Sequence, residues 1–170
     1  MASAMALLEQ MRDASGIPET IGLPDDVILD FMDKDSTLIQ AIEEASAKHS
    51  QFPSKQLMMD EADLVKHLQE DYVNFYAPAT VNPYVAIAGR GPWIVTSHGA
   101  VLHDNGGYGM LGGGHGPTEI IEAMSENHVM ANVMTPSFSQ SRMAAALRKE
   151  LGHSRGCLLY TSPSPRDKRQ

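Results

Sequence analysis

The chain has 170 residues, 42% of them hydrophobic and 20% charged, with a formal net charge of −8. This length and composition predict one ordinary globular domain that buries roughly 70% of its unfolded surface. The negative charge argues against a nucleic-acid-binding surface, which needs clustered lysine and arginine. Cys157 is the single cysteine, so no internal disulfide can form and a reducing compartment is favoured. No apolar run approaches the roughly 20 residues that cross a bilayer, and the first residues do not form a secretory signal, so we expect a cytoplasmic protein.

Residues 1–75 are predicted to be mostly helical, with short breaks. Four apolar stripes at helical spacing indicate helices that face a core and carry solvated charges on the other side. The stripes are Leu7–Met11, Val27–Met32, Leu38–Ala45 and Leu64–Tyr72. We expect Asp25 to open the second helix, Ser36 to cap the third, and Asp60 with Asp63 to cap the fourth.

The character of the sequence changes at Pro78. Residues 84–88 predict a strand. Trp93–Thr96 and Ala100–His103 flank Ser97-His98-Gly99, which predicts a β-hairpin. We therefore expect a first region at residues 1–75 and a second at 76–156.

Two more helices are predicted in the second region. Pro117 is expected to open one of them and Thr135-Pro136 the other, because proline favours the first helical positions. The first helix is expected to carry Ile120, Ile121 and Met124 on one face. The second is expected to place Met143, Leu147 and Leu151 inward and to stop at Gly152.

Residues 157–170 differ from the rest of the chain, because they are basic, proline-punctuated and without periodicity. They resemble a translated sequencing adapter, so we expect a non-native read-through tail; a disordered native tail is the alternative. On the first interpretation the natural protein continues past Gly156 and this chain is a truncated piece.

The most informative segment is rich in glycine: seven of the 14 glycines fall between Gly106 and Gly116. Such a segment lets the backbone turn sharply or approach a partner closely. Gly107-x-Gly109-x-x-Gly112 matches a dinucleotide-binding fingerprint after a strand and before a helix. That fingerprint needs its helix to start inside the motif, whereas Pro117 places the start about five residues later. A dinucleotide-binding domain is therefore the weaker alternative. His115 is expected to make hydrogen bonds that fix the loop, and no metal site is expected.

The order of these features resembles the N-terminal region of class III aminotransferases, which are pyridoxal-phosphate enzymes of fold type I. The matching residues are Ser97-x-Gly99, Asp104, Gly107, Gly114-His115, Pro117, Ile120-Ile121 and Ala123. The resemblance covers about residues 72–156. It departs from the family pattern at Asp104, which lies one place late, and at the second histidine of the family motif, which is missing.

The resemblance implies an α/β protein, with an α+β small domain and the start of a large domain, that works as a homodimer. It implies pyridoxal phosphate as cofactor and amino transfer between an amino donor and a keto acid or aldehyde. It places Tyr108, and Phe138 or Ser139, in substrate-facing positions. It places Gly107, Gly109, Gly112, Gly113, Gly114 and His115 near the active site or dimer interface. From the residues alone, Tyr108 could equally pack as a hairpin aromatic, and Ser137 and Ser139 could cap a helix.

The family's cofactor-anchoring lysine, the acid that pairs with the cofactor ring and the phosphate loop all lie downstream of Gly156 in its layout. No catalytic residue is therefore expected in this chain, which should be inactive alone. We also expect the hairpin to lack sheet partners, so that apolar surface is exposed and the chain self-associates. A different class of function stays open, a small acidic helical protein-interaction domain built on residues 1–75.

Overall fold

Strand β2, Trp93–Thr96, is the centre of the fold in a computed structural model that describes residues 2–73, 84–105, 112–127, 129 and 135–152. It pairs antiparallel with β1, Ala86–Arg90, on one side and with β3, Val101–His103, on the other. The described strands thus form a three-stranded antiparallel sheet in the order β1-β2-β3. All four residues of β2 are buried.

The predicted hairpin is confirmed, and its register places Trp93 opposite His103 and Val95 opposite Val101. Gly99 in the turn has φ of +71°, a conformation that glycine adopts without strain. The prediction that the hairpin lacks sheet partners is wrong, since β1 completes the sheet. The strand predicted at residues 84–88 lies two residues later than expected, and a register irregularity falls between Ala86 and Ala88.

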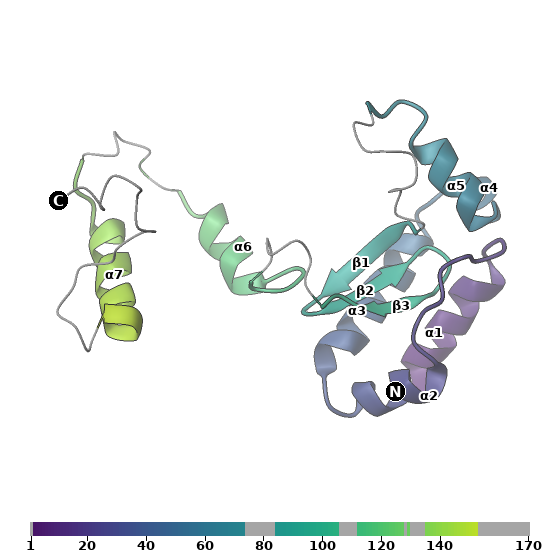
Figure 1. The fold of residues 1–170 in the computed structure, drawn as a ribbon, viewed down its shortest axis with the longest axis horizontal. Helices are drawn as coiled ribbons and strands as arrows, with labels where there is room; N and C mark the ends of the chain where they lie inside the picture. Colours follow the sequence, from purple (N-terminus) through teal and green to yellow (C-terminus); the bar gives the residue numbers. More distant parts are fainter. Residues whose placement is uncertain (1, 74–83, 106–111, 128, 130–134, 153–170) are drawn as a thin grey trace, which may run out of the picture. The chain divides into compact units, whose positions relative to one another are not determined.

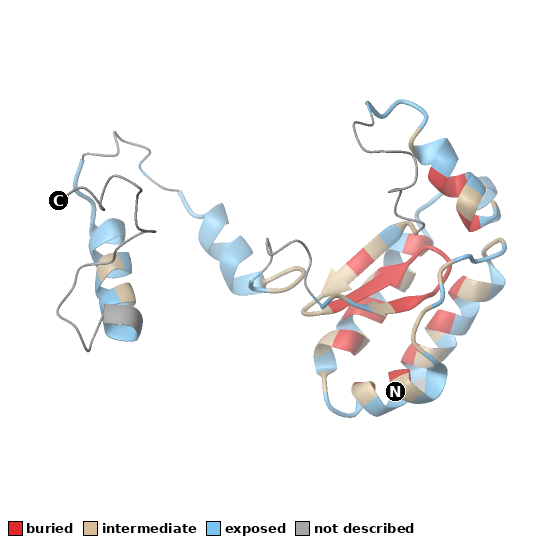
Figure 2. Cartoon of the chain, viewed as in Figure 1, coloured by how far each residue is buried: buried red, intermediate tan, exposed pale blue. Residues whose placement is uncertain are grey.

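The helices that precede the sheet are α1 (Ala2–Asp13), α2 (Asp25–Met32), α3 (Ser36–His49), α4 (Ser54–Leu57) and α5 (Glu61–Leu68). The first three supply the rest of the core. Helix α3 packs against β1 and β2, and both α1 and α2 pack against α3 (Figure 1). Buried residues gather on β2 and on the inner faces of α1 and α3 (Figure 2). Helices α1, α2 and α3 therefore share one hydrophobic core with the sheet that follows Pro78. The buried residues of α4 and α5, Leu57, Leu64 and Val65, lie outside that cluster.

Two of the predicted caps are different in the structure. The N-cap of α3 is Asp35 instead of Ser36, because the Asp35 carboxylate accepts a hydrogen bond from the amide of Thr37 at 2.9 Å. Asp60 does precede α5, but its side chain accepts from the amide of Ile17 and makes no cap bond to its own helix. Helix α5 ends at Leu68, so Tyr72 lies beyond it and is 68% exposed.

The later helices carry little buried surface. Helix α6, Thr118–Ser125, follows Pro117 as predicted, and its apolar residues are exposed. The chain divides into two compact units at Glu126. In the second unit α7 runs from Phe138 to Leu147 and a π-helical turn follows over Arg148–Gly152.

Helix α7 starts later than predicted. Its N-cap is Ser137, whose hydroxyl accepts from the amide of Gln140 at 3.1 Å, so the capping role considered for Ser137 is confirmed. Met143 is 64% exposed, and its predicted inward orientation is wrong. None of the helices in the described ranges is long and apolar enough to cross a membrane.

Candidate functional site

The two ends of the glycine-rich segment are joined by a small set of contacts, which we call the loop neck: Gly91, Asp104 and His115. The His115 Nε2 atom lies 3.0 Å from Asp104 Oδ2, and both side chains are less than one quarter exposed. The His115 amide donates to the Gly91 carbonyl at 2.7 Å, and the Gly91 amide donates to the His115 carbonyl at 3.0 Å. The prediction that His115 makes hydrogen bonds to fix the loop is confirmed.

Glycine is required where the neck closes. Gly114 has φ of +75°, and a Cβ atom there would lie 2.8 Å from the Gly91 carbonyl oxygen. Gly91 itself has φ of +52°, and its Cβ would lie 2.9 Å from Thr37 Oγ1. Both backbones can approach each other, and α3, only because neither residue has a side chain.

Arg90 ties the neck to α3. Its Nε donates to Glu44 Oε2 at 2.7 Å, and its Nη1 donates to the Gly116 carbonyl at 3.0 Å. Lys48 pairs with the other oxygen of Glu44 at 2.7 Å. The hydrogen bond from Lys48, helped by Arg90 and opposed by burial, lowers the pKa of Glu44 below its usual value. The carboxylate is therefore held ionised between two cations.

A second set of contacts fixes the strand that leads into the segment. The Trp93 indole nitrogen donates to Asp35 Oδ2 at 2.8 Å, and the Trp93 ring meets His103 edge-on with 4.9 Å between ring centroids. His103 Nδ1 in turn lies 2.6 Å from Asn105 Oδ1. Burial raises the pKa of Asp35, but the hydrogen bonds from Thr37 and Trp93 outweigh it, so the net shift is downward.

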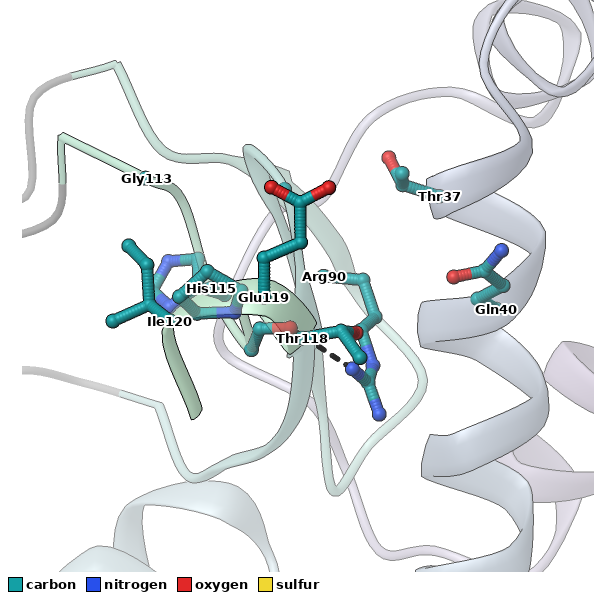
Figure 3. A pocket seen from close by; sticks show the side chains of 11 residues that line it. Thr37, Gln40, Arg90, Gly113, His115, Thr118, Glu119 and Ile120 are labelled. Carbon is teal, nitrogen blue, oxygen red and sulfur yellow. Dashed lines mark hydrogen bonds between the residues drawn. The ribbon is translucent and has the colours of Figure 1, made fainter. Parts of the chain in front are cut away.

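A pocket of about 410 Å³ lies beside the neck (Figure 3). It has the size of small-molecule pockets. Thr37 and Gln40 reach it from α3, and Arg90 from the end of β1 (Figure 3). The remaining lining residues are Gly91 and residues from the end of the glycine-rich segment and the start of α6: Gly113, His115, Gly116, Pro117, Thr118, Glu119 and Ile120.

The predicted site residues are only partly brought together. Gly113 and His115 line the pocket, and Gly114 closes the neck. Gly112 is exposed, and a Cβ atom added there would have no other atom within 4 Å. Gly107, Tyr108 and Gly109 lie outside the described residues. Phe138 and Ser139 lie in the second unit, in the first turn of α7, and both are exposed.

Sequence reasoning missed Thr37, Gln40 and Arg90. Arg90 has no motif around it, and Thr37 and Gln40 lie in the first turns of an ordinary amphipathic helix. Their role follows from the packing of α3 on β1, for which no local signal exists.

Two other kinds of site can be compared with this geometry. Within the described residues no group of three or more His, Cys, Asp or Glu side chains could hold a metal ion. The dinucleotide fingerprint finds no support, because β3 belongs to an antiparallel sheet and α6 begins at Thr118, beyond Gly112. The amides of α6 are thus not inside the motif.

Comparisons with known proteins give no assignment. No protein-family model matches the chain, and no match was found among curated proteins or solved structures.

Proposed function

We propose that this chain is the N-terminal part of a class III, pyridoxal-phosphate-dependent aminotransferase of fold type I, in which residues 106–116 form part of the wall of the substrate entrance. The observation that carries the proposal is the loop neck. Asp104 and His115 belong to the ordered set of residues that resembles the family, and in the structure they pair with each other. The resemblance therefore rests on residues that share one structural task.

The neck suits a segment that must present backbone to a ligand. Fixing both ends of a loop removes most of the conformations that it could otherwise adopt, so less entropy is lost when a ligand binds. The hydrogen bond between His115 and Asp104, the Gly91 backbone pairing and the Arg90 bond to Gly116 all act at these ends. The adjacent pocket of about 410 Å³ could admit a small molecule.

The cofactor itself does not fit the described part of this chain. Its Schiff base needs an unpaired lysine at the site, and none of the described lysines lines the pocket. Lys48 and Lys66 form ion pairs within their own helices, and Lys34, just beyond α2, pairs with Asp30 of that helix. Lys55 is exposed, and the Lys149 side chain is 83% exposed in the second unit.

We therefore derive no catalytic step for this chain. The proposal places the anchoring lysine, the acid that pairs with the cofactor ring and the phosphate loop in another part of a cytoplasmic homodimeric enzyme. That enzyme would transfer an amino group between an amino donor and a keto acid or aldehyde. The present chain would supply the entrance wall and be inactive alone.

Two experiments test the proposal. The chain is incubated with pyridoxal phosphate, reduced with borohydride and digested for mass spectrometry; no stoichiometric phosphopyridoxyl-lysine is expected, and finding one would refute the claim of inactivity. The source DNA is then read beyond the codon for Gly156. We expect an open frame that encodes a phosphate loop and a later lysine. A complete product that forms no Schiff base with pyridoxal phosphate would refute the aminotransferase proposal.

One observation favours the second candidate, a small acidic interaction domain. Helix α6 exposes Ile120 by 50%, Ile121 by 54% and Met124 by 78%, and these residues share one helical face. An apolar face of this kind is typical of a helix that packs on another protein. A gene that encodes the folded unit but no cofactor-binding half would favour this candidate.

A further inference from the structure

Two buried histidines and two serines form a hydrogen-bonded chain at the turn end of the hairpin, whereas the loop neck lies at its other end. His49 is the last residue of α3 and is 7% exposed; His98 lies in the β2–β3 turn and is 3% exposed. Ser15 follows α1, and Ser97 precedes His98. We call these four residues the histidine cluster. It joins the ends of α1 and α3 to the turn.

The contacts identify which ring nitrogens carry hydrogen. Ser15 Oγ lies 2.7 Å from the Met11 carbonyl and 2.9 Å from the Ser97 carbonyl, so its single hydroxyl proton is directed at acceptors. His49 Nε2, 3.2 Å from the same oxygen, must then be the donor. With that hydrogen in place, the neutral imidazole of His49 satisfies the contact.

The contacts of His98 also identify which of its ring nitrogens carries hydrogen. Its Nε2 lies 2.9 Å from the Met59 carbonyl and therefore carries a hydrogen. Its Nδ1 then accepts from Ser97 Oγ, 3.0 Å away. Both ring nitrogens of His98 are thus hydrogen-bonded, one as donor and one as acceptor.

The charged groups around the cluster offer no compensation for an imidazolium. From α1, Arg12 donates to the Gly99 carbonyl and pairs with Asp25. From the start of α5, Asp60 accepts from the amide of Ile17, and Glu61 accepts from two other backbone amides. On α3 itself, Glu44 is held by Lys48 and Arg90. Each of these carboxylates is already engaged, and Arg12 adds positive charge.

We propose that the histidine cluster is an acid-sensitive latch, in which proton uptake at His49 loosens the ends of α1 and α3 from the β2–β3 turn. The latch is closed at neutral pH, where the His49 ring is neutral and bonded to Ser15. It opens in mildly acidic solution, where the cluster would have to enclose a charge without a partner.

The direction of the pKa shift agrees with this geometry. Burial lowers the pKa of His49 below its usual value near 6.5, the nearby His98 lowers it further, and the hydrogen bond to the Ser97 backbone opposes them. Because the unfolded chain binds this proton more tightly, the contribution of neutral His49 to the stability of the fold is complete above the pKa of His49 in the unfolded chain. It is lost as the pH falls from there towards the folded pKa.

The test measures urea unfolding of the full chain at about pH 7.5 and about pH 5.5, a window above the titration of ordinary carboxylates. We expect the unfolding equilibrium constant of the wild type to rise by up to about tenfold from this one site. His49→Gln, which keeps an N–H donor towards Ser15 but cannot titrate, should lose that part of the rise. The matched control is His67→Gln, because His67 lies on the surface of α5 with its side chain 42% exposed; this variant should behave as the wild type.

A second measurement keeps the proposal testable even when His49→Gln does not fold. In the wild type, the ring proton resonances of each histidine are followed by NMR across the same pH range. The His49 midpoint should lie below the usual histidine pKa of about 6.5, because burial lowers the pKa of His49. A His49 midpoint at or above the usual value of about 6.5, or an unchanged pH dependence in a folded His49→Gln variant, would refute the latch.

Discussion

Replacing Glu61 by alanine should destabilise the first unit by about 2–4 kcal/mol. Glu61 is fully buried at the start of α5, a rare position for a carboxylate without a metal or cationic partner. Its Oε2 accepts from the amides of Glu19 and Thr20, each at 2.7 Å, and its Oε1 accepts from the Thr20 hydroxyl at 3.0 Å. The side chain thus holds the segment between α1 and α2 against α5.

The magnitude follows from those three bonds. A hydrogen bond to a charged group contributes about 1.5–3 kcal/mol, and removing the acceptor leaves two amides without a partner. Glu19 is exposed and Thr20 half-buried, so water replaces part of what is lost, which places the sum at about 2–4 kcal/mol. Glu61→Gln keeps one oxygen for both amides, and the Thr20 hydroxyl can turn to accept from the new amide. Glu61→Gln should therefore lose only the contribution of the charge to these hydrogen bonds, about 1 kcal/mol of stability.

The assay is urea unfolding at neutral pH, followed by the fluorescence of Trp93, the single tryptophan. A loss of 1 kcal/mol corresponds to a fall in melting temperature of about 3–5 °C for a unit of this size. Glu43→Ala is the control, because Glu43 is exposed on α3, and it should change stability by less than about 0.5 kcal/mol. If Glu61→Ala matched this control, the buried carboxylate would not be holding the segment.

Three further predictions concern the neck, the core and acid stability. Gly91→Ala should lower the free energy of unfolding by about 1–2 kcal/mol, because φ is +52° and the new Cβ would meet Thr37. Gly112→Ala is the control and should be close to neutral, because a Cβ there would meet no other atom. Thermal melts of both variants check this. Trp93→Phe removes the indole donor to Asp35 and should cost about 2 kcal/mol. Because this variant has no tryptophan, its urea unfolding and that of the wild type are followed by circular dichroism, and equal stability would show that the bond contributes nothing. The pKa values of Asp35 and Glu44 are lowered in the fold, so their contribution is present above the unfolded pKa and is lost as the pH falls through the folded values. Stability should therefore decrease below about pH 4.5, less steeply in Glu44→Gln than in the wild type; identical acid profiles would contradict the reasoning.

Much of the local structure was predictable because its causes lie within a few residues. The apolar stripes at helical spacing became the buried faces of α1, α2, α3 and α5, and the Ser97-His98-Gly99 turn produced the expected hairpin. Errors fell at the ends of elements. Asp35 and Ser36 are adjacent and both able to cap a helix, so the sequence could not distinguish them.

Burial of individual charges was not predictable in the same way. Nothing in the sequence singled out Glu61, which is fully buried and accepts hydrogen bonds from amides of the segment before α2. The same holds for the link from Glu44 through Arg90 to Gly116, which joins a helix, a strand and a loop. Partners so far apart in the chain meet only after the core has formed.

The candidate site shows most clearly which features follow from the sequence alone and which depend on the tertiary structure. The amino-acid sequence was sufficient to mark the glycine-rich segment, the helix after Pro117 and a fixing role for His115, because steric freedom and hydrogen-bonding capacity belong to the residues themselves. Only the tertiary structure decided that Asp104 and Gly91 are the partners of His115 and that Thr37, Gln40 and Arg90 share its pocket. The reason is that these contacts depend on the packing of α3 against β1, a consequence of burying the whole apolar surface at once rather than of any local pattern.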